Sequence, residues 1–129
     1  MILPLGWGKS PRREANLGKA SREKGKRGER EVAALLKEYG FDGRRGQQYC
    51  GATGEADVVG LPGVHIEVKR TEAFHLWDAL KQSKFDARDG EMPTVWHRKN
   101  GEQWVVVLPA EEFIEMYRRS NGTQKENQV

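Results

Sequence analysis

The chain has 129 residues and a net charge of +3, with 36% hydrophobic and 32% charged residues, which suits one globular domain and argues against intrinsic disorder. No apolar run approaches the roughly 18 residues of a membrane span, and the first residues lack the features of a signal peptide, so neither is expected. The single cysteine, Cys50, excludes an intramolecular disulfide and makes a reducing cytoplasm the expected compartment.

The first segment of the chain is strongly basic. Residues 1–30 carry nine Lys or Arg and three Glu, a charge of +6, whereas the remainder of the chain carries −3. Residues 1–24 show no apolar periodicity and are rich in Gly, Ser, Lys and Arg, which predicts a flexible basic arm. Such an arm is expected to contact nucleic-acid phosphates. The alternative is a solvated leader that binds nothing in particular.

A helix and three strands are predicted next. The helix covers residues 26–39, ends at Gly40 and carries one apolar stripe, formed by Val32, Leu35, Leu36 and Tyr39. The polar, Gly-rich stretch 43–51 is predicted to contain one strand that ends in a loop. Two short apolar runs, 56–59 and 64–69, are predicted strands, and the Gly- and Pro-containing link between them is short enough for a hairpin.

The second half of the chain predicts a helix, a hairpin and a last helix. The helix covers residues 76–88, with Trp77 and Leu80 facing inward. Strands 94–97 and 103–108 flank Asn100-Gly101, a strong hairpin signal. Pro109 opens a helix that reaches about residue 119, and the polar tail 120–129 is predicted to be loose. The inward residues of this last helix are expected to be Ala110, Phe113, Ile114 and Tyr117.

The resulting element order is αβββαββα. It predicts a mixed sheet flanked by helices, of the α/β or α+β class, in one domain over residues 25–119.

Three residues of the two short strands suggest metal-assisted chemistry. Glu67 and Lys69 are two positions apart, so they share one face of their strand. If the hairpin pairs Asp57 with Glu67, their Cβ atoms lie about 5 Å apart. Two carboxylates that close repel each other unless a cation or proton lies between them, and a divalent ion such as Mg²⁺ prefers oxygen ligands. The alternative is a solvent-facing strand, because the pattern Glu-x-Lys alone is common.

A longer set of motifs resembles the PD-(D/E)XK nucleases, and among them the archaeal-type and phage Holliday junction resolvases. The motifs are Lys-Gly-Lys-Arg-Gly-Glu-Arg-Glu at 24–31, Ala56-Asp57 and Glu67-Val68-Lys69, within a match over about residues 24–108. Ala56 stands where the superfamily name has Pro. The resemblance implies a restriction-endonuclease-like core and an active site formed by Glu29, Asp57, Glu67 and Lys69. Glu29 is preferred to Glu31, because a helix places these two about 200° apart.

The resemblance further implies a metal ion and DNA as partners. The expected cofactor is Mg²⁺, or Mn²⁺ in its place, with Asp57, Glu67 and the backbone carbonyl of Val68 as ligands and Glu29 reached through a water. Gln82 matches a Gln that related nucleases carry on the following helix, although an exposed helical Gln is the equal alternative. The expected DNA-binding residues are Lys24, Lys26, Arg27, Arg30, Arg44, Arg45, Gln47 and Gln82.

Other residues are given structural roles or remain open. His65, His75 and His97 have no zinc-ligand spacing and are interpreted as structural, with His65 placed on the face opposite Glu67. Cys50 lacks a base partner in its segment, and Arg70 is expected to point away from Lys69. Apolar side chains without obvious cover (Phe74, Trp77 and Phe85) favour a homodimer.

The function predicted from the sequence is therefore a cytoplasmic, Mg²⁺-dependent endodeoxyribonuclease encoded by a bacterium, archaeon or phage, selective for branched DNA in recombination or repair. Two alternatives stay open: a nuclease for nicked, single-stranded or restriction-type targets, and a DNA-binding module that keeps the fold without the chemistry.

Overall fold

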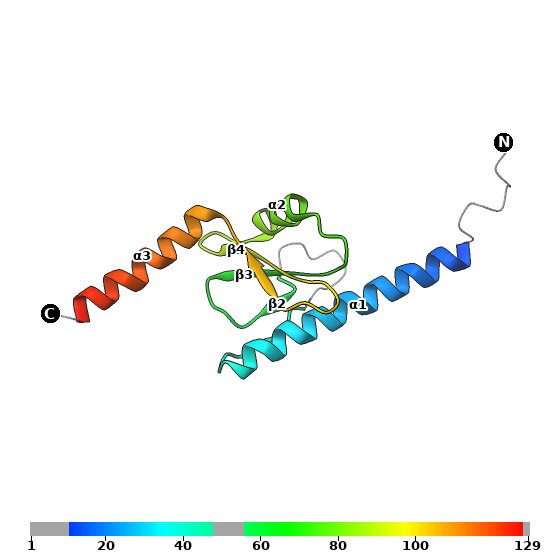
Figure 1. Ribbon diagram of the computed structural model, residues 1–129, viewed down its shortest axis with the longest axis horizontal. Helices are drawn as coiled ribbons and strands as arrows, with labels where there is room; N and C mark the ends of the chain where they lie inside the picture. Colours follow the sequence, from blue (N-terminus) through cyan, green and yellow to red (C-terminus); the bar gives the residue numbers. More distant parts are fainter. Residues whose placement is uncertain (1–10, 48–55, 128–129) are drawn as a thin grey trace.

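The predicted element order is the order found. The computed structural model describes residues 11–47 and 56–127, with side chains described over 18–47 and 56–122. Its helices and strands follow the order αβββαββα (Figure 1). They are α1 (Pro11–Glu38), β1 (Arg44–Arg45), β2 (Val58–Val59), β3 (Val64–Arg70), α2 (Leu76–Asp86), β4 (Met92–Arg98), β5 (Val105–Val107) and α3 (Ala110–Asn127).

The strands form one mixed sheet with the order β1-β2-β3-β4-β5 in the described residues. Neighbouring strands are antiparallel except β3 and β4, which run parallel because α2 crosses over between them. In the β2–β3 hairpin Val58 is opposite Ile66, and the same register continued by one residue places Asp57 opposite Glu67. The predicted β4–β5 hairpin is also present, and Gly101 in its loop has the positive φ of 78° that glycine tolerates best.

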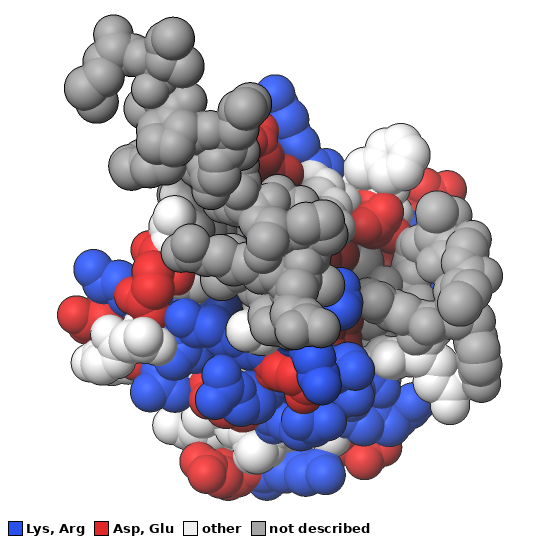
Figure 2. Space-filling model, turned by 90° about the vertical axis from the view of Figure 1, so that its right-hand side faces the viewer, with Lys and Arg blue, Asp and Glu red and all other residues white. Residues whose placement is uncertain are grey.

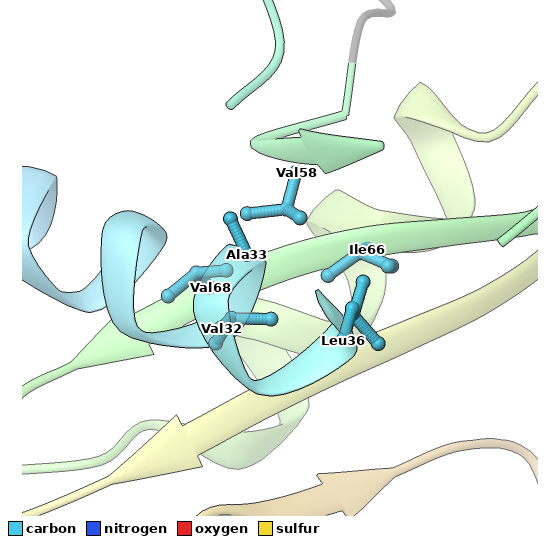
Figure 3. Packing of buried hydrophobic residues seen from close by; sticks show 6 residues of the cluster. All are labelled: Val32, Ala33, Leu36, Val58, Ile66 and Val68. Carbon is cyan, nitrogen blue, oxygen red and sulfur yellow. The ribbon is translucent and has the colours of Figure 1, made fainter. Parts of the chain in front are cut away.

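Helix α1 covers one face of the sheet. Its buried residues Val32, Ala33 and Leu36 pack against Val58, Ile66 and Val68 (Figure 3). The helix ends in a Schellman motif: the amides of Gly40 and Phe41 donate to the carbonyls of Lys37 and Leu36, and Gly40 takes a φ of 89°. Tyr39 was predicted to face inward, but it is 75% exposed, because α1 ends at Glu38 and Tyr39 lies in the turn that follows.

Helix α2 covers the opposite face. Ala79 and Leu80 pack against Val95 of β4, and the buried hydroxyl of Ser83 donates a hydrogen bond to the Thr94 carbonyl. The prediction that Trp77 faces inward is wrong: its side chain is 73% exposed. The inward stripe is set by Ala79, Leu80 and Ser83, and Trp77 lies outside it on the helical wheel.

Both terminal segments are more ordered than the sequence predicted. Residues 11–24 were expected to form part of a flexible arm, yet they are the first half of α1, which begins at Pro11. The segment has good helix formers and proline at the first helical position, and it lacks an apolar stripe because this half of the helix runs past the sheet (Figure 1). Residues 1–10 lie outside the described part of the chain.

Helix α3 also departs from its prediction. It continues to Asn127 through the segment that was expected to be a loose tail. It extends away from the sheet (Figure 1), so the residues predicted to face inward are exposed: Ala110, Phe113, Ile114 and Tyr117. An apolar stripe shows which side of a helix avoids water, but among the described residues Phe113, Ile114 and Tyr117 remain at least 50% exposed. None of the helices in the described residues carries the long apolar stretch that crossing a bilayer requires.

Candidate metal and nucleic-acid site

The two strands of the β2–β3 hairpin bring two carboxylates together. Val58 and Ile66 point toward α1, so the alternation of a strand turns Asp57 and Glu67 to the other face of the sheet. The backbone amide of Val68 donates a 2.8 Å hydrogen bond to Oδ2 of Asp57. This bond anchors the Asp57 side chain to the strand that carries Glu67 and Lys69.

Glu67 lies almost completely inside the protein, with 2% of its surface exposed. Burial raises the pKa of Glu67 to about 7, the hydrogen bond with His65 opposes the rise, and the nearby Asp57 adds to it. A buried carboxylate beside a second carboxylate is costly unless a cation or a proton compensates the charge. The pair is therefore poised to accept one or the other.

Glu29 of α1 joins this group from the edge of the sheet. Its side chain accepts a 2.8 Å hydrogen bond from Nε of Arg45 in β1. Burial raises the pKa of Glu29, the bond from Arg45 opposes the rise, and repulsion from Asp57 adds to it. Because the Asp57 carboxylate contributes to the raised pKa of Glu29, the Glu of α1 lies near Asp57.

Glu31, two residues further along α1, lies in a different group. It accepts hydrogen bonds from Arg98 at 2.9 Å and from the Trp104 indole at 3.1 Å. Arg70 also reaches this side of the sheet, where it donates to Asn100 at 2.8 Å. The sequence-based preference for Glu29 over Glu31, and the expectation that Arg70 points away from Lys69, agree with these contacts.

Lys69 extends the site toward α2. Its Nζ atom donates a 3.0 Å hydrogen bond to Oε1 of Gln82, so the two residues that the sequence paired only by resemblance are in contact. Both line a cavity of about 300 Å³ together with Phe74, His75 and Asp78. Phe74, which was expected to lack cover, stacks on His97 with ring centroids 3.9 Å apart.

The contact that sequence reasoning missed is that of His65 with Glu67. His65 was placed on the face opposite Glu67, and this is wrong: residues two apart in a strand share a face. Its Nε2 lies 2.7 Å from Oε1 of Glu67, and the imidazole is fully buried. The alternation rule applied to residues 65 and 67 would have found this contact.

Most of the side chains predicted to bind DNA are exposed. Lys26, Arg27, Arg30 and Arg44 are exposed, whereas Lys24 pairs with Glu72 at 3.2 Å. Gln47 is exposed as well, while Gln48 and Cys50 lie outside the described residues. Figure 2 looks onto the end from which α1 begins and shows Lys and Arg side chains gathered over the lower part of this face.

The donor set fits a hard divalent cation. Asp57, Glu67 and Glu29 supply carboxylate oxygens, which Mg²⁺ and Mn²⁺ prefer over nitrogen or sulfur. Burial is the main cause that raises the pKa values of Glu29 and Glu67, and repulsion from Asp57 contributes to both. A bound cation would relieve this repulsion. Among the described residues, the group of three potential metal ligands whose ligand atoms all lie within 4.8 Å of one another is a different set, His65, Glu67 and Asp86, and it shares only Glu67 with the carboxylates named above.

Comparison with known proteins identifies the fold. No protein-family model matches the chain, and no curated protein sequence matches it significantly. Among solved structures, the chain is similar to Hjc, a Holliday junction resolvase from the archaeal hyperthermophile Archaeoglobus fulgidus. The two share 24% sequence identity with a TM-score of 0.53, over 65% of this chain and 76% of Hjc. The predicted restriction-endonuclease-like fold, and at that level the predicted resemblance, are therefore confirmed.

Proposed function

We propose that this protein is a metal-dependent endodeoxyribonuclease that acts on branched DNA such as a four-way junction. The observation that carries the proposal is that Asp57, held by the amide of Val68, lies across the β2–β3 hairpin from the buried Glu67. The fold is that of a protein described as a Holliday junction resolvase, which favours branched DNA over other targets.

The carboxylates have one role in this proposal and Lys69 another. Asp57, Glu67 and the Val68 carbonyl would hold Mg²⁺ or Mn²⁺, with Glu29 acting through a water. The ion would lower the pKa of a bound water and neutralise charge on a phosphodiester. Lys69 is held by Gln82. Its ammonium group is a suitable donor to the attacking water or to the negative charge that develops on the phosphate.

The basic side chains supply the binding energy for DNA. Lys26, Arg27 and Arg30 are exposed on α1, within three residues of Glu29 in the sequence, and Arg44 is exposed on β1. Cations placed beside an acidic metal site attract the phosphate backbone that the acids alone would repel. Arg45 pairs with Glu29, and a metal ion that compensates the charge of this carboxylate would make Arg45 more available to a phosphate.

A DNA-binding module without chemistry is the less favoured candidate. Such a module gains nothing from burying Glu67 next to Asp57, an arrangement that weakens binding of a polyanion. A nuclease for nicked, single-stranded or restriction-type DNA would use the same residues, and only the substrate separates it from the proposed enzyme. Acting on cellular DNA, either enzyme would work in the cytoplasm of a bacterium or archaeon, or of a phage-infected cell.

A cleavage assay on matched substrates tests the proposal. Labelled four-way junction, nicked duplex, linear duplex and single strand are each incubated with the full chain and Mg²⁺, with EDTA and Asp57→Ala as controls. We expect Mg²⁺-dependent cuts near the branch point of the junction, symmetric on two opposed strands. If linear duplex or single strand is cut as well as the junction, the protein is a nuclease without selectivity for branched DNA. If the protein binds DNA but cleaves none of the substrates in Mg²⁺ or Mn²⁺, it is a DNA-binding module without nuclease activity.

A further inference from the structure

His65 and Glu67 form a buried polar pair within the interior. Both side chains are buried, at 0% and 2% exposure, and Nε2 of His65 lies 2.7 Å from Oε1 of Glu67. They lie on the face of β3 that α2 covers, next to the strand that carries the buried Val95. Glu67 therefore meets a protein donor on its inner side and the Asp57 carboxylate on its outer side.

The imidazole is poorly suited to a purely structural role. Among the described residues no hydrogen-bond partner lies within reach of its Nδ1 atom, although that atom is buried. A buried polar atom without a partner is destabilising, and an apolar side chain of similar size would avoid the cost. What the ring contributes in return is the single bond to Glu67.

We propose that His65 is a positioning residue for the metal site of the proposed nuclease. It fixes one oxygen of Glu67 from inside the protein, so that the carboxylate keeps one rotamer and offers its second oxygen on the Asp57 side. A carboxylate that is held in place loses less conformational freedom when it binds an ion, and the partners that orient metal ligands contribute measurably to affinity. This inference rests on the proposed function, because it assigns Glu67 as a metal ligand.

Asp86, at the end of α2, offers a competing interpretation. Its carboxylate, Glu67 and His65 have ligand atoms within 4.8 Å of one another, so the three could hold an ion among themselves. The close contact between Nε2 and Oε1 argues against this, because both atoms already satisfy each other. Substitution of Asp86 separates the two interpretations.

The test is calorimetric titration of the metal-free full chain with Mn²⁺, with thermal denaturation of every variant to establish folding. His65→Leu should weaken Mn²⁺ binding by about 10- to 100-fold, the range found when partners of metal ligands are removed. His65→Gln places an amide NH₂ near the original Nε2 and should recover most of the affinity. Ser83→Ala, which removes a buried α2–β4 hydrogen bond without touching Glu67, and Asp86→Asn should both bind as the wild type does.

Three results would overturn the inference. They are unchanged affinity in His65→Leu, no advantage of His65→Gln over His65→Leu, and a loss in Asp86→Asn as large as that in His65→Leu. If His65→Leu does not fold, His65→Asn takes its place, since its shorter amide cannot reach Glu67, and the same outcomes apply. Asp57→Asn tests the underlying function. If this variant also binds Mn²⁺ with wild-type affinity, the proposed metal site is wrong. If Asp57→Asn loses Mn²⁺ affinity while His65→Leu keeps it, only the positioning role of His65 is wrong.

Discussion

The amide of Val68 donates a hydrogen bond of 2.8 Å to the Asp57 carboxylate, and this bond links Asp57, the residue directly before β2, to the strand that carries Glu67 and Lys69. An Asn side chain keeps an oxygen that can accept this bond, so Asp57→Asn removes the charge while the anchoring contact remains. The substitution therefore separates the chemistry of Asp57 from its contribution to the fold.

We expect Asp57→Asn to reduce Mg²⁺-dependent cleavage by at least about a hundredfold, because a metal ligand is removed. Binding of DNA should stay equal or become tighter, because one negative charge that repels phosphate has gone. Single-turnover cleavage and a gel-shift titration measure the two effects. The control is Asp89→Asn, an exposed acid after α2, which should change neither quantity. Cleavage by Asp57→Asn at the wild-type rate would refute the site.

The first half of α1 should contact DNA phosphates. Lys19 and Arg22 are exposed on this helical extension. Replacing both with Gln should flatten the slope of log K against log salt by about 0.9 for each phosphate that the variant no longer neutralises. The measurement is a binding titration with a four-way junction across a salt series. Lys37→Gln, at the other end of the same helix, is the control. Equal slopes for the wild type, the double variant and Lys37→Gln would mean that the first half of α1 does not contact DNA phosphates.

Two glycines of α1 should respond to alanine in opposite ways. A Cβ atom at Gly28 would lie 2.6 Å from Cβ of Arg70, so α1 and β3 would have to move apart to accommodate it. At Gly25 nothing lies within 4 Å of the added atom. Gly25→Ala should stabilise the protein by up to about 1 kcal/mol through helix propensity, and Gly28→Ala should destabilise it by about 1–3 kcal/mol through overpacking. Urea denaturation decides; similar stability of both variants would mean that the close approach is easily relieved.

Much of this site could be predicted because it depends on local rules. The alternation of Glu67, Val68 and Lys69 and the short link after Val59 together determine which side chains share a face and which residue faces Asp57. The same alternation places His65 beside Glu67, so this contact too was within reach of the sequence. These features need only neighbouring residues and a hairpin register.

The features that were predicted wrongly depend on what covers an element. The stripe on α3 identifies an apolar side, yet no local rule tells whether Phe113 and Ile114 meet this chain's own sheet or another surface. The opposite holds for residues 11–24, where helix propensity suffices although no apolar stripe marks the helix. The apolar pattern by itself therefore decides neither case.

The metal-free protein should lose stability as the pH rises. Burial, the main cause, and Asp57 raise the pKa of Glu67 from 4.5 to about 7, so the folded state holds a proton that the unfolded state releases. Burial lowers the pKa of His65, but Glu67, Glu91 and Asp86 together raise it by more, and the net rise acts in the same direction. Between pH 4.5 and 7 the stability contributed by the bound proton is therefore lost, and at 1.36 kcal/mol per pKa unit the Glu67 part is on the order of 3 kcal/mol.

Urea denaturation in EDTA at pH 5, 6, 7 and 8 measures this loss. Glu67→Gln cannot ionise and removes the charge that raises the pKa of His65, so its stability should vary much less over the same range. Saturating Mg²⁺ should restore the wild type at pH 8 and leave Glu67→Gln nearly unchanged. A wild-type stability that is flat with pH in EDTA would mean that Glu67 ionises in the folded state without penalty.

The last prediction is that two copies associate through the surface made by β5 and α3. Val105 and Val106 on the edge strand, and Phe113, Ile114 and Tyr117 on α3, are all more than 40% exposed, and large apolar side chains exposed on an edge strand and on one helix face favour association. A two-fold dimer would also give a four-way junction the two sites that symmetric cleavage requires. Light scattering at micromolar concentration should therefore give about twice the chain mass of 14.7 kDa.

Substitutions on two helices decide which surface forms this dimer. Ile114→Glu places a charge in the apolar stripe of α3 and should halve the measured mass, whereas Glu112→Lys, about 160° away around the same helix, should not. Trp77→Glu tests the exposed apolar residues of α2, Trp77 and Phe85, which form the competing surface. If Trp77→Glu alone yields monomers, the interface belongs to α2. A wild-type protein that is monomeric and still cuts both strands of a junction would remove the need for a dimer, because the paired cuts would then come from two successive encounters with one site.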